Sequence, residues 1–470
     1  MFVTPVIYAQ ADTLAHRIVL IGDAGQLTNG RHPVVDGVRK NIPLDNRTTI
    51  LFLGDNLYKT GLPDRQFSTI YAQARAVLDS QISIADGTGA KVYMIPGNHD
   101  WDNGRRGGYD AIIRQQLYVD FLGKGDTVSY FPKDGCPGPD VVKLGNDVVI
   151  ILFDSQWWLH PHAKPEIESD CKCKTTQELT GQIRDIAMQN ARKLVIVASH
   201  HPFRSKGIHG GFFTLKQHIF PFTDLRKNLY IPLPVIGSIY PIARSVFGTP
   251  QDLSHPTYAN MIKEIGDAVT ASCPNAIFVS GHDHNLQYIK DSGYHYVVSG
   301  GGCKQSRTSN SKTSLFNSTS QGFSVIEVSK KQTVTLSFYT VEDSVERLYR
   351  EPILNFRFIP DEEPPTPPRE IEDPYAKYRD TITLSADEKF QAIGGLKKFF
   401  MGQNYRKEWS APVNMKVFKV SQEKGGFTNY TLGGGTQTLS LGLVDSKKKE
   451  WVLRTVSKNP EGYIPVSLRG

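Results

Sequence analysis

The stretch Thr49-Ile-Leu-Phe-Leu-Gly-Asp-Asn-Leu-Tyr58 joins an apolar run to a polar turn. Its first five residues are apolar or β-branched, a pattern that predicts a buried strand. Gly54 ends the run, and the oxygen donors Asp55 and Tyr58 follow it closely. We therefore expect these side chains at the carboxyl end of a strand, where open α/β sheets carry their sites.

Four further segments repeat this arrangement of an apolar run followed by a polar turn. They are Gly22-Asp-Ala-Gly25, Gly97-Asn-His-Asp100, Ser199-His-His-Pro202 and Gly281-His-Asp-His284. Each one alone is more often an ordinary turn than a ligand set. The five in order supply carboxylate, amide, phenol and imidazole groups at strand ends, and this is the ligand inventory of a two-metal hydrolase site.

The other apolar runs extend the pattern along the chain. They predict strands at 17–21, 91–95, 147–153, 194–198, 276–280 and 295–299, and a closing hairpin at 323–328 and 333–339. Helical patterns occupy 66–79, 108–122, 176–192 and 255–271. Strands that alternate with helices in this way indicate an α/β layout.

Composition sets the broad class of protein. The 470 residues include 54 Lys and Arg against 47 Asp and Glu, a net charge of +7. This surplus favours a small anionic substrate, and the absence of a basic block argues against nucleic acid as a partner. With 39% hydrophobic residues, the chain has the composition of a globular protein of more than one domain.

The N-terminus resembles the end of an export signal. Residues 1–11 are largely apolar and finish in the small-x-small sequence Ala9-Gln-Ala11. An unstructured or strand-like N-terminus is the alternative. We expect an exported protein, periplasmic, in the outer envelope or secreted, without a transmembrane helix, because no run of apolar residues is long enough to span a bilayer.

Five cysteines, an odd number, fit no complete disulfide framework. Cys136 and the pair Cys171 and Cys173 lie in polar loops on either side of one predicted strand. A single bridge between these loops is one interpretation. A zinc site is the weaker alternative, since a second cysteine pair is missing.

Composition shifts define the expected domains. We expect a leader remnant at 1–16, a catalytic domain at 17–345, a Pro-rich linker at 346–385 and a small β-rich module at 386–470, complete or cut short at Gly470. Residues 228–248 form an apolar insertion rich in Pro and Gly, either a segment packed on the domain surface or a lid, partner surface or membrane-touching loop.

Donor chemistry divides the candidate ligands between two metal ions. Asp23 and Tyr58 offer charged oxygen atoms that suit a hard trivalent ion. The imidazoles of His200 and His282 and the amide oxygen of Asn98 suit a softer divalent ion. Asp55, which is central in the motif order, is the natural bridging ligand.

The ordered motifs resemble those of the calcineurin-like metallophosphoesterase superfamily. Within it, the sequences Gly54-Asp-Asn-Leu-Tyr58 and Gly281-His-Asp-His284, with Asp23-Ala-Gly25 in place of Asp-x-His, are similar to the purple acid phosphatase branch. The resemblance covers residues 17–339. It implies the metallophosphoesterase fold, an α/β (α+β) class in which a two-sheet β-sandwich is flanked by helices.

The resemblance also implies roles for individual residues. It places Asp23, Asp55, Tyr58 and His284 on a ferric ion, and Asp55, Asn98, His200 and His282 on a divalent Fe, Zn or Mn ion. His200 rather than His201 is the expected ligand. His99 and Asn98 would position the phosphate, and His209 would protonate the leaving group.

The function implied is hydrolysis of phosphate monoesters by direct attack of a metal-bound hydroxide. A phosphodiesterase or nucleotide hydrolase on the same site is one alternative, with Trp157, Trp158 and the insertion as pocket walls. Arg105 and Arg106 would clamp phosphate or lie in a solvated loop. The linker and the Gly-rich tail motivate a different class, an envelope anchoring or interaction protein with a secondary phosphatase domain.

Overall fold

The computed structural model describes residues 13–122, 127–213, 215–223, 228–233, 238, 249–342 and 344–356, together with strand segments between 379 and 456. It separates into two compact units, residues 1–360 and 361–470. The expected leader, most of the 228–248 insertion and most of the linker lie outside the described residues.

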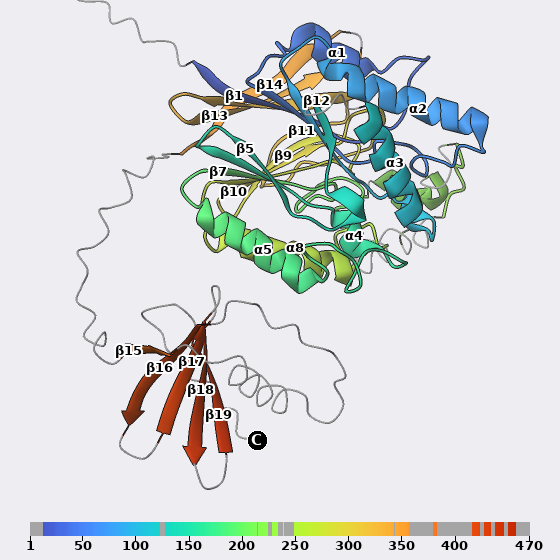
Figure 1. Ribbon diagram of the computed structural model, residues 1–470. Helices are drawn as coiled ribbons and strands as arrows, with labels where there is room; N and C mark the ends of the chain where they lie inside the picture. Colours follow the sequence, from blue (N-terminus) through green and yellow to red (C-terminus); the bar gives the residue numbers. More distant parts are fainter. Residues whose placement is uncertain are drawn as a thin grey trace, which may run out of the picture. The chain divides into compact units, whose positions relative to one another are not determined.

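Two mixed sheets of seven strands form the core of the first unit (Figure 1). The first sheet runs β14 (Glu346–Asn355), β13 (Thr333–Thr340), β12 (Gly322–Ser329), β1 (Leu14–Ile21), β2 (Thr48–Leu53), β3 (Lys91–Ile95) and β4 (Val128–Tyr130). The second runs β11 (Ser314–Ser318), β9 (Leu286–Asp291), β10 (Tyr294–Ser299), β8 (Ala276–Ser280), β7 (Leu194–Ala198), β6 (Val148–Leu152) and β5 (Asp140–Leu144). In the first sheet the strands β1 to β4 are parallel and reach one edge, and antiparallel strands extend the sheet beyond β1. In the second sheet the parallel strands β10, β8, β7 and β6 lie at the centre, with antiparallel strands on both sides.

Helices cover the outer face of each sheet (Figure 1). The first sheet carries α1 (Pro33–Asn41), α2 (Ser68–Ile82) and α3 (Gly108–Leu122). The second carries α4 (Ser155–Leu159), α5 (Thr176–Gln189) and α8 (Pro256–Thr270), and the short α6 (Leu215–Ile219) follows β7 in the chain. The result is a four-layer sandwich.

Strand periodicity explains why the two sheets stack. On β1, Val19 and Ile21 point into the cluster under the helices, whereas Ile18 and Leu20 point into the cluster between the sheets. Alternate residues face opposite sides of a sheet, so a strand that is apolar throughout requires cover on both faces. All five residues from Arg17 to Ile21 are buried, as such a strand demands.

The predicted fold class is confirmed. Each predicted strand and the closing hairpin β12–β13 is present, and the helix 108–122 has the predicted bounds. One difference concerns the linker, because Glu346–Asn355 of β14 pair with β13 in register with the first sheet. This edge strand is polar and half exposed, so it lacks the apolar run that marks a buried strand. The other domain boundaries stay predictions.

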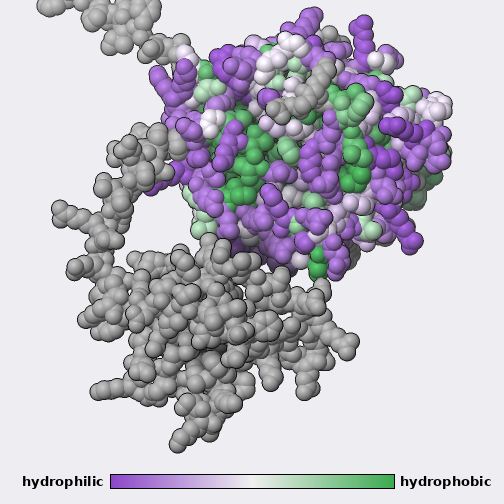
Figure 2. Space-filling model, viewed as in Figure 1, coloured by the Kyte–Doolittle hydropathy of each residue, from purple (hydrophilic) through white to green (hydrophobic). Residues whose placement is uncertain are grey.

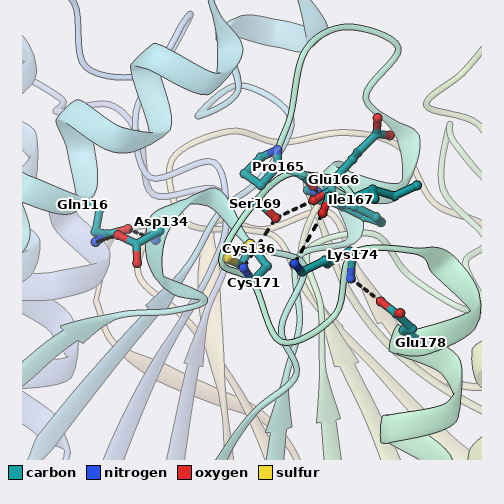
Figure 3. The surroundings of a disulfide bond; sticks show 11 residues. Gln116, Asp134, Cys136, Pro165, Glu166, Ile167, Ser169, Cys171, Lys174 and Glu178 are labelled. Atoms are coloured by element: carbon teal, nitrogen blue, oxygen red, sulfur yellow. Dashed lines mark hydrogen bonds between the residues drawn. A yellow bond between two sulfur atoms is a disulfide. The ribbon is translucent and has the colours of Figure 1, made fainter. Parts of the chain in front are cut away.

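A disulfide joins Cys136 to Cys171 (Figure 3). It ties the loop before β5 to the long loop before α5, with the two Cα atoms 5.6 Å apart. Lys174 Nζ donates to the Ile167 carbonyl at 3.3 Å in the same loop. Cys173 stays a free, buried thiol, so the bridge and not a zinc site accounts for this cysteine group.

The second unit contributes a separate antiparallel sheet. Its order is β15 (Arg379–Ile382), β16 (Lys416–Glu423), β17 (Phe427–Gly433), β18 (Thr438–Asp445) and β19 (Glu450–Val456). A β-rich C-terminal region is therefore present, as predicted.

The surface of the first unit is largely hydrophilic on the face shown in Figure 2, with hydrophobic side chains gathered in a few separate areas. Among the helices that the structure describes, none has the length and apolar character needed to cross a membrane.

Candidate metal centre

The five motifs meet at one edge of the sandwich. Asp23, Asp55 and Asn98 follow β1, β2 and β3 of the first sheet, and His200 and His282 follow β7 and β8 of the second. These strands are parallel within each sheet, so their carboxyl ends share an edge. Each sheet thus contributes half of one donor cluster.

Three of the clustered residues have a strained backbone. Asp23, Asp55 and His282 adopt positive φ angles of 59°, 53° and 70°. Non-glycine residues seldom occupy this region, and those that do are concentrated at functional sites. The turns after β2 and β3 also pack closely together. A Cβ atom at Gly97 would lie only 2.4 Å from Asp55 Oδ1, so a larger residue would clash there. These turns are built to bring donor atoms together.

The first group of donor atoms consists of His200 Nε2, His282 Nδ1 and Asn98 Oδ1. Asn98 Oδ1 lies 3.0 Å from His200 Nε2 and 3.1 Å from His282 Nδ1, and the two ring nitrogens are 3.2 Å apart. Asp55 Oδ1 approaches His200 Nε2 at 3.4 Å. All four residues are buried.

Backbone carbonyls determine which ring nitrogens face this group. His200 Nδ1 lies 2.8 Å from the Leu53 carbonyl, and His282 Nε2 lies 2.9 Å from the Gln251 carbonyl. A carbonyl oxygen only accepts, so each of these nitrogens carries the hydrogen of its neutral ring. Their partners, His200 Nε2 and His282 Nδ1, then present lone pairs to each other and to the Asn98 oxygen. A proton or a cation is needed among them.

The second group consists of Asp23 Oδ1, the Tyr58 hydroxyl and His284 Nε2. The hydroxyl donates to Asp23 Oδ1 at 2.9 Å and lies 3.1 Å from His284 Nε2, which is 3.4 Å from Asp23 Oδ1. The carboxylates of Asp23 and Asp55 and the His200 ring also bring donor atoms within 4.8 Å of one another. Asp55 thus connects the two groups, and the seven predicted ligands form one cluster.

His201 lies in the same cluster of rings, and its nitrogens have other partners. Nδ1 is 2.8 Å from Ser155 Oγ, and Nε2 is 2.7 Å from Gln251 Oε1. Its donor atoms are within 4.8 Å of those of His200 and His282, but both are occupied. This geometry favours His200 over His201 as the ligand.

His209 and His99 flank the cluster. The His209 ring lies against the His282 ring, with centroids 4.0 Å apart, and its Nδ1 is 2.9 Å from the carboxylate of buried Asp252. The His99 ring lies edge-on to Tyr58 at 4.6 Å, and its backbone N–H donates to Asp55 Oδ1 at 2.9 Å.

Asp100 ties two of the ligand turns together. Its buried carboxylate accepts backbone N–H groups of Asn56, Leu57 and Gly97 at 3.1, 3.0 and 2.8 Å. The side-chain amides of Asn56 and Gln115 donate to it as well. The turns after β2 and β3 therefore share one acceptor, which sets the spacing of Asp55 and Asn98.

Burial and neighbouring charge shift the pKa values of the cluster. Burial alone would raise the pKa of Asp55, but His200 and His99 lower it to about 2. Burial and Asp55 raise the pKa of Asp100 to about 7. Burial and the nearby Asp23 raise the pKa of Tyr58 well above 10.0. The cluster concentrates negative charge, and it would attract cations.

The pKa values of the clustered histidines are shifted in opposite directions. Burial disfavours the charged ring, but the carboxylates of Asp55 and Asp23 outweigh it and raise the pKa of His200. Burial and the charge of His209 lower the pKa of His282 well below 6.5. Burial likewise lowers the pKa of His201.

Other candidates lie apart from the cluster. Trp157 and Trp158 are buried in the core under α4, α5 and α8, where Trp157 Nε1 donates to the Pro165 carbonyl at 2.8 Å. Arg105 is 63% exposed and pairs with Asp102. The two tryptophans thus pack in the core, and Arg105 matches the solvated-loop alternative.

Sequence reasoning missed three residues that the fold brings to the centre: Gln251, Asp252 and Lys304. Gln251 and Asp252 lie just before α8 and contact His282 and His209. The Lys304 ammonium lies 3.0 Å from the centre of the Tyr58 ring. None sits in a motif after an apolar strand, and only the run Gly300-Gly-Gly302 before Lys304 signalled a close approach.

Residues 16–229 match the model of the calcineurin-like phosphoesterase family, and this match, together with the donor cluster, supports a metal-dependent phosphoesterase.

Two solved structures are similar to the chain at low identity. One is GAP50, the anchor in the inner membrane complex of Plasmodium, at 18% identity over 74% of this chain and 90% of that chain, with a TM-score of 0.44. The other is the purple acid phosphatase PPD1 from yellow lupin (Lupinus luteus) seeds, at 13% identity over 70% and 52%, with a TM-score of 0.38. No curated protein matches the chain.

Proposed function

We propose that this protein is an exported phosphomonoesterase of the purple acid phosphatase type, with two metal ions at the edge of the sandwich. One observation carries the proposal. The lone pairs of His200 Nε2 and His282 Nδ1 face each other at 3.2 Å, and the Asn98 oxygen completes the group. Atoms that only accept hydrogen bonds repel one another at this distance unless a proton or a cation lies among them, and a metal cation satisfies all three donors at once.

The donor sets fit the two ions differently. His200, His282 and Asn98 would hold a divalent ion, because imidazole and amide donors suit Zn, Fe and Mn. Asp23, Tyr58 and His284 would hold a ferric ion through charged oxygen atoms, and Asp55 would bridge the pair. Bound ions would supply an activated water and positive charge for the phosphate oxygens.

The chain's own residues would handle the leaving group. Asp252 accepts a hydrogen bond from His209 Nδ1, which leaves Nε2 of that ring to give a proton to the departing alkoxide. His99 lies beside the cluster and Asn98 within it, and both would hold the phosphate in line. This division of roles needs no covalent phosphoenzyme.

The disulfide supports export. A bridge such as Cys136–Cys171 forms and persists in oxidising compartments and is rare in reducing ones. It agrees with the signal-like residues 1–11, and the C-terminal module offers a means of envelope association.

Metal binding is tested with two buried histidines of equal exposure. His282 and His295 are each 3% exposed, but His295 lies on β10 and contacts Tyr288 instead of the cluster. We expect His282→Gln to lose at least one equivalent of bound metal by elemental analysis and His295→Gln to retain both. Equal metal content in the two variants would refute the ligand set.

Substrate class is tested with a phosphomonoester and a phosphodiester of the same leaving group. We expect the metal-loaded protein to prefer the monoester and Asp55→Asn to lose turnover with metal. Preference for the diester would identify a phosphodiesterase, and absence of turnover by metal-loaded protein would contradict the enzymatic proposal.

The ferric assignment has an optical test. A phenolate on Fe(III) absorbs visible light, so iron-loaded protein should be coloured and Tyr58→Phe colourless with iron still bound. A colourless, fully active protein that holds only divalent ions would disprove the ferric site alone.

A further inference from the structure

Lys304 is a cation at the centre that no predicted role uses. Its ammonium lies over the face of the Tyr58 ring, 3.0 Å from the ring centre. The hydroxyl of this ring contacts Asp23 and His284, whereas the ammonium lies over the ring centre and not at the hydroxyl. Lys304 therefore stands beside the cluster rather than within it.

The backbone holds this lysine in place. Before it, Gly302 N–H donates to the Gly22 carbonyl at 3.0 Å. After it, Ser306 N–H donates to the His284 carbonyl at 2.6 Å. The loop that follows β10 is thus pinned to the first and the last ligand turns, and the position of Lys304 is coupled to theirs.

Lys304 also lacks a structural ion pair. Within the part of the chain that the structure describes, no carboxylate lies within 4.0 Å of its ammonium, although the residue is half-buried. Its contacts are therefore the Tyr58 ring and, from beyond ion-pair distance, the carboxylates of Asp55 and Asp23, which favour the charged ammonium against the cost of burial.

A second lysine lies on the same side. Lys59 follows Tyr58, is exposed, and through its carbonyl contacts His99 Nδ1 at 2.7 Å. Burial lowers the pKa of Lys304, the nearby Asp55 and Asp23 carboxylates raise it, and the charge of Lys59 lowers it, so both lysines and both carboxylates influence one another here. Two cations on the Tyr58 side of the metal centre would attract anions.

We propose that Lys304, with Lys59 beside it, forms an anion subsite on the Tyr58 side of the metal centre that binds a second phosphate group of the substrate. The inference rests on the proposed phosphoesterase function. The scissile phosphate would be held by the metal ions, Asn98 and His99, and the two lysines would hold the neighbouring phosphate. The substrate class is then a phosphate ester or anhydride that carries two phosphates.

The matched ligands AMP and ADP differ by one phosphate and test this subsite. We expect ADP to compete with p-nitrophenyl phosphate at least about tenfold more tightly than AMP, and Lys304→Met to remove most of that ratio. The control is Lys143→Met, an exposed lysine on β5 at the edge of the second sheet. Metal content is measured in each sample, because ADP chelates metal ions.

The outcomes separate the subsite from the proposed function. Turnover of p-nitrophenyl phosphate with an unchanged ADP-to-AMP ratio in Lys304→Met would refute the subsite and leave the phosphatase intact. An equal loss for both ligands would place Lys304 on the scissile phosphate instead. Without turnover, calorimetric titration of metal-loaded protein with the two nucleotides gives the same ratio.

A stability measurement distinguishes binding from a structural role. Because Lys304 is half-buried and has no carboxylate within ion-pair distance among the described residues, Lys304→Met in metal-loaded protein should keep or raise the melting temperature while it weakens ADP binding. A fall of several degrees with unchanged ADP affinity would assign the lysine to the fold and overturn the proposal.

Discussion

The carboxylate of Asp252 lies 2.9 Å from Nδ1 of His209, and it is buried while the ring is partly exposed. The other carboxylate oxygen accepts from both the backbone N–H and the hydroxyl of Thr249 at 2.8 Å. The acid is thus held on two sides, and its orientation determines which nitrogen of His209 faces the cluster.

This pair predicts a dependence on the leaving group. Asp252→Asn should lower kcat by up to about 10²-fold for alkyl phosphates, because a general acid contributes most when the leaving group is basic. With p-nitrophenyl phosphate the loss should be small. The measurement is the slope of log kcat against leaving-group pKa, and His209→Gln should give the same slope. Equal losses for both kinds of ester would exclude this role.

Removal of the Asp100 carboxylate should lower the stability of the protein and also its metal binding. Removing its carboxylate in Asp100→Ala leaves several buried N–H donors without an acceptor, each worth about 1–3 kcal/mol. We expect the free energy of unfolding to fall by at least about 3 kcal/mol, with loss of bound metal. The control is Asp267→Ala, whose exposed carboxylate pairs with Lys263 on the same helix. A small effect of Asp100→Ala would show that the turns keep their spacing independently.

Asp154 predicts a pH dependence of stability. Burial raises the pKa of this carboxyl from 3.8 to about 7, although Trp157 N–H and the Trp101 indole donate to it. Between these two values the folded protein holds a proton that the unfolded chain has lost. Its contribution to stability therefore falls as the pH rises, by up to about 1.4 kcal/mol per pH unit.

The check on Asp154 is a comparison of urea unfolding at several pH values. Asp154→Asn cannot titrate, so its stability relative to the wild type should improve as the pH rises from 4 toward about 7 and then level off. A constant difference between the two proteins across this range would contradict the raised pKa.

Removal of the disulfide should lower the stability of the protein and leave its activity unchanged. Cys136 and Cys171 are 35 residues apart, a loop for which the chain-entropy model gives about 4 kcal/mol. Cys136→Ser with Cys171→Ser should unfold at a lower temperature and become insensitive to reductant, with turnover unchanged at 25 °C. Reductant that leaves the wild-type melting temperature unchanged would show that the bridge adds nothing.

Motif placement explains how much of the site was predictable. Asp55 and His282 each follow an apolar strand directly. Because the strands within each sheet are parallel, the turns at their carboxyl ends lie at one edge, and stacking of the two sheets brings these turns together. The donor types at these turns then predicted the ligand groups. Asp252 and Gln251 had no such signal, because they precede a helix and reach the centre only when α8 packs on the second sheet.

By itself, the sequence predicted the buried apolar strands, the fold class and the seven side chains that cluster, because an apolar run and the turn after it are local properties. Tertiary structure alone decided how the donors group and which nitrogen of His200 and His282 faces the centre, because carbonyls of distant segments at Leu53 and Gln251 select it. It also decided that Lys304 lies over Tyr58, a contact between residues 246 positions apart in the chain, which no local pattern encodes.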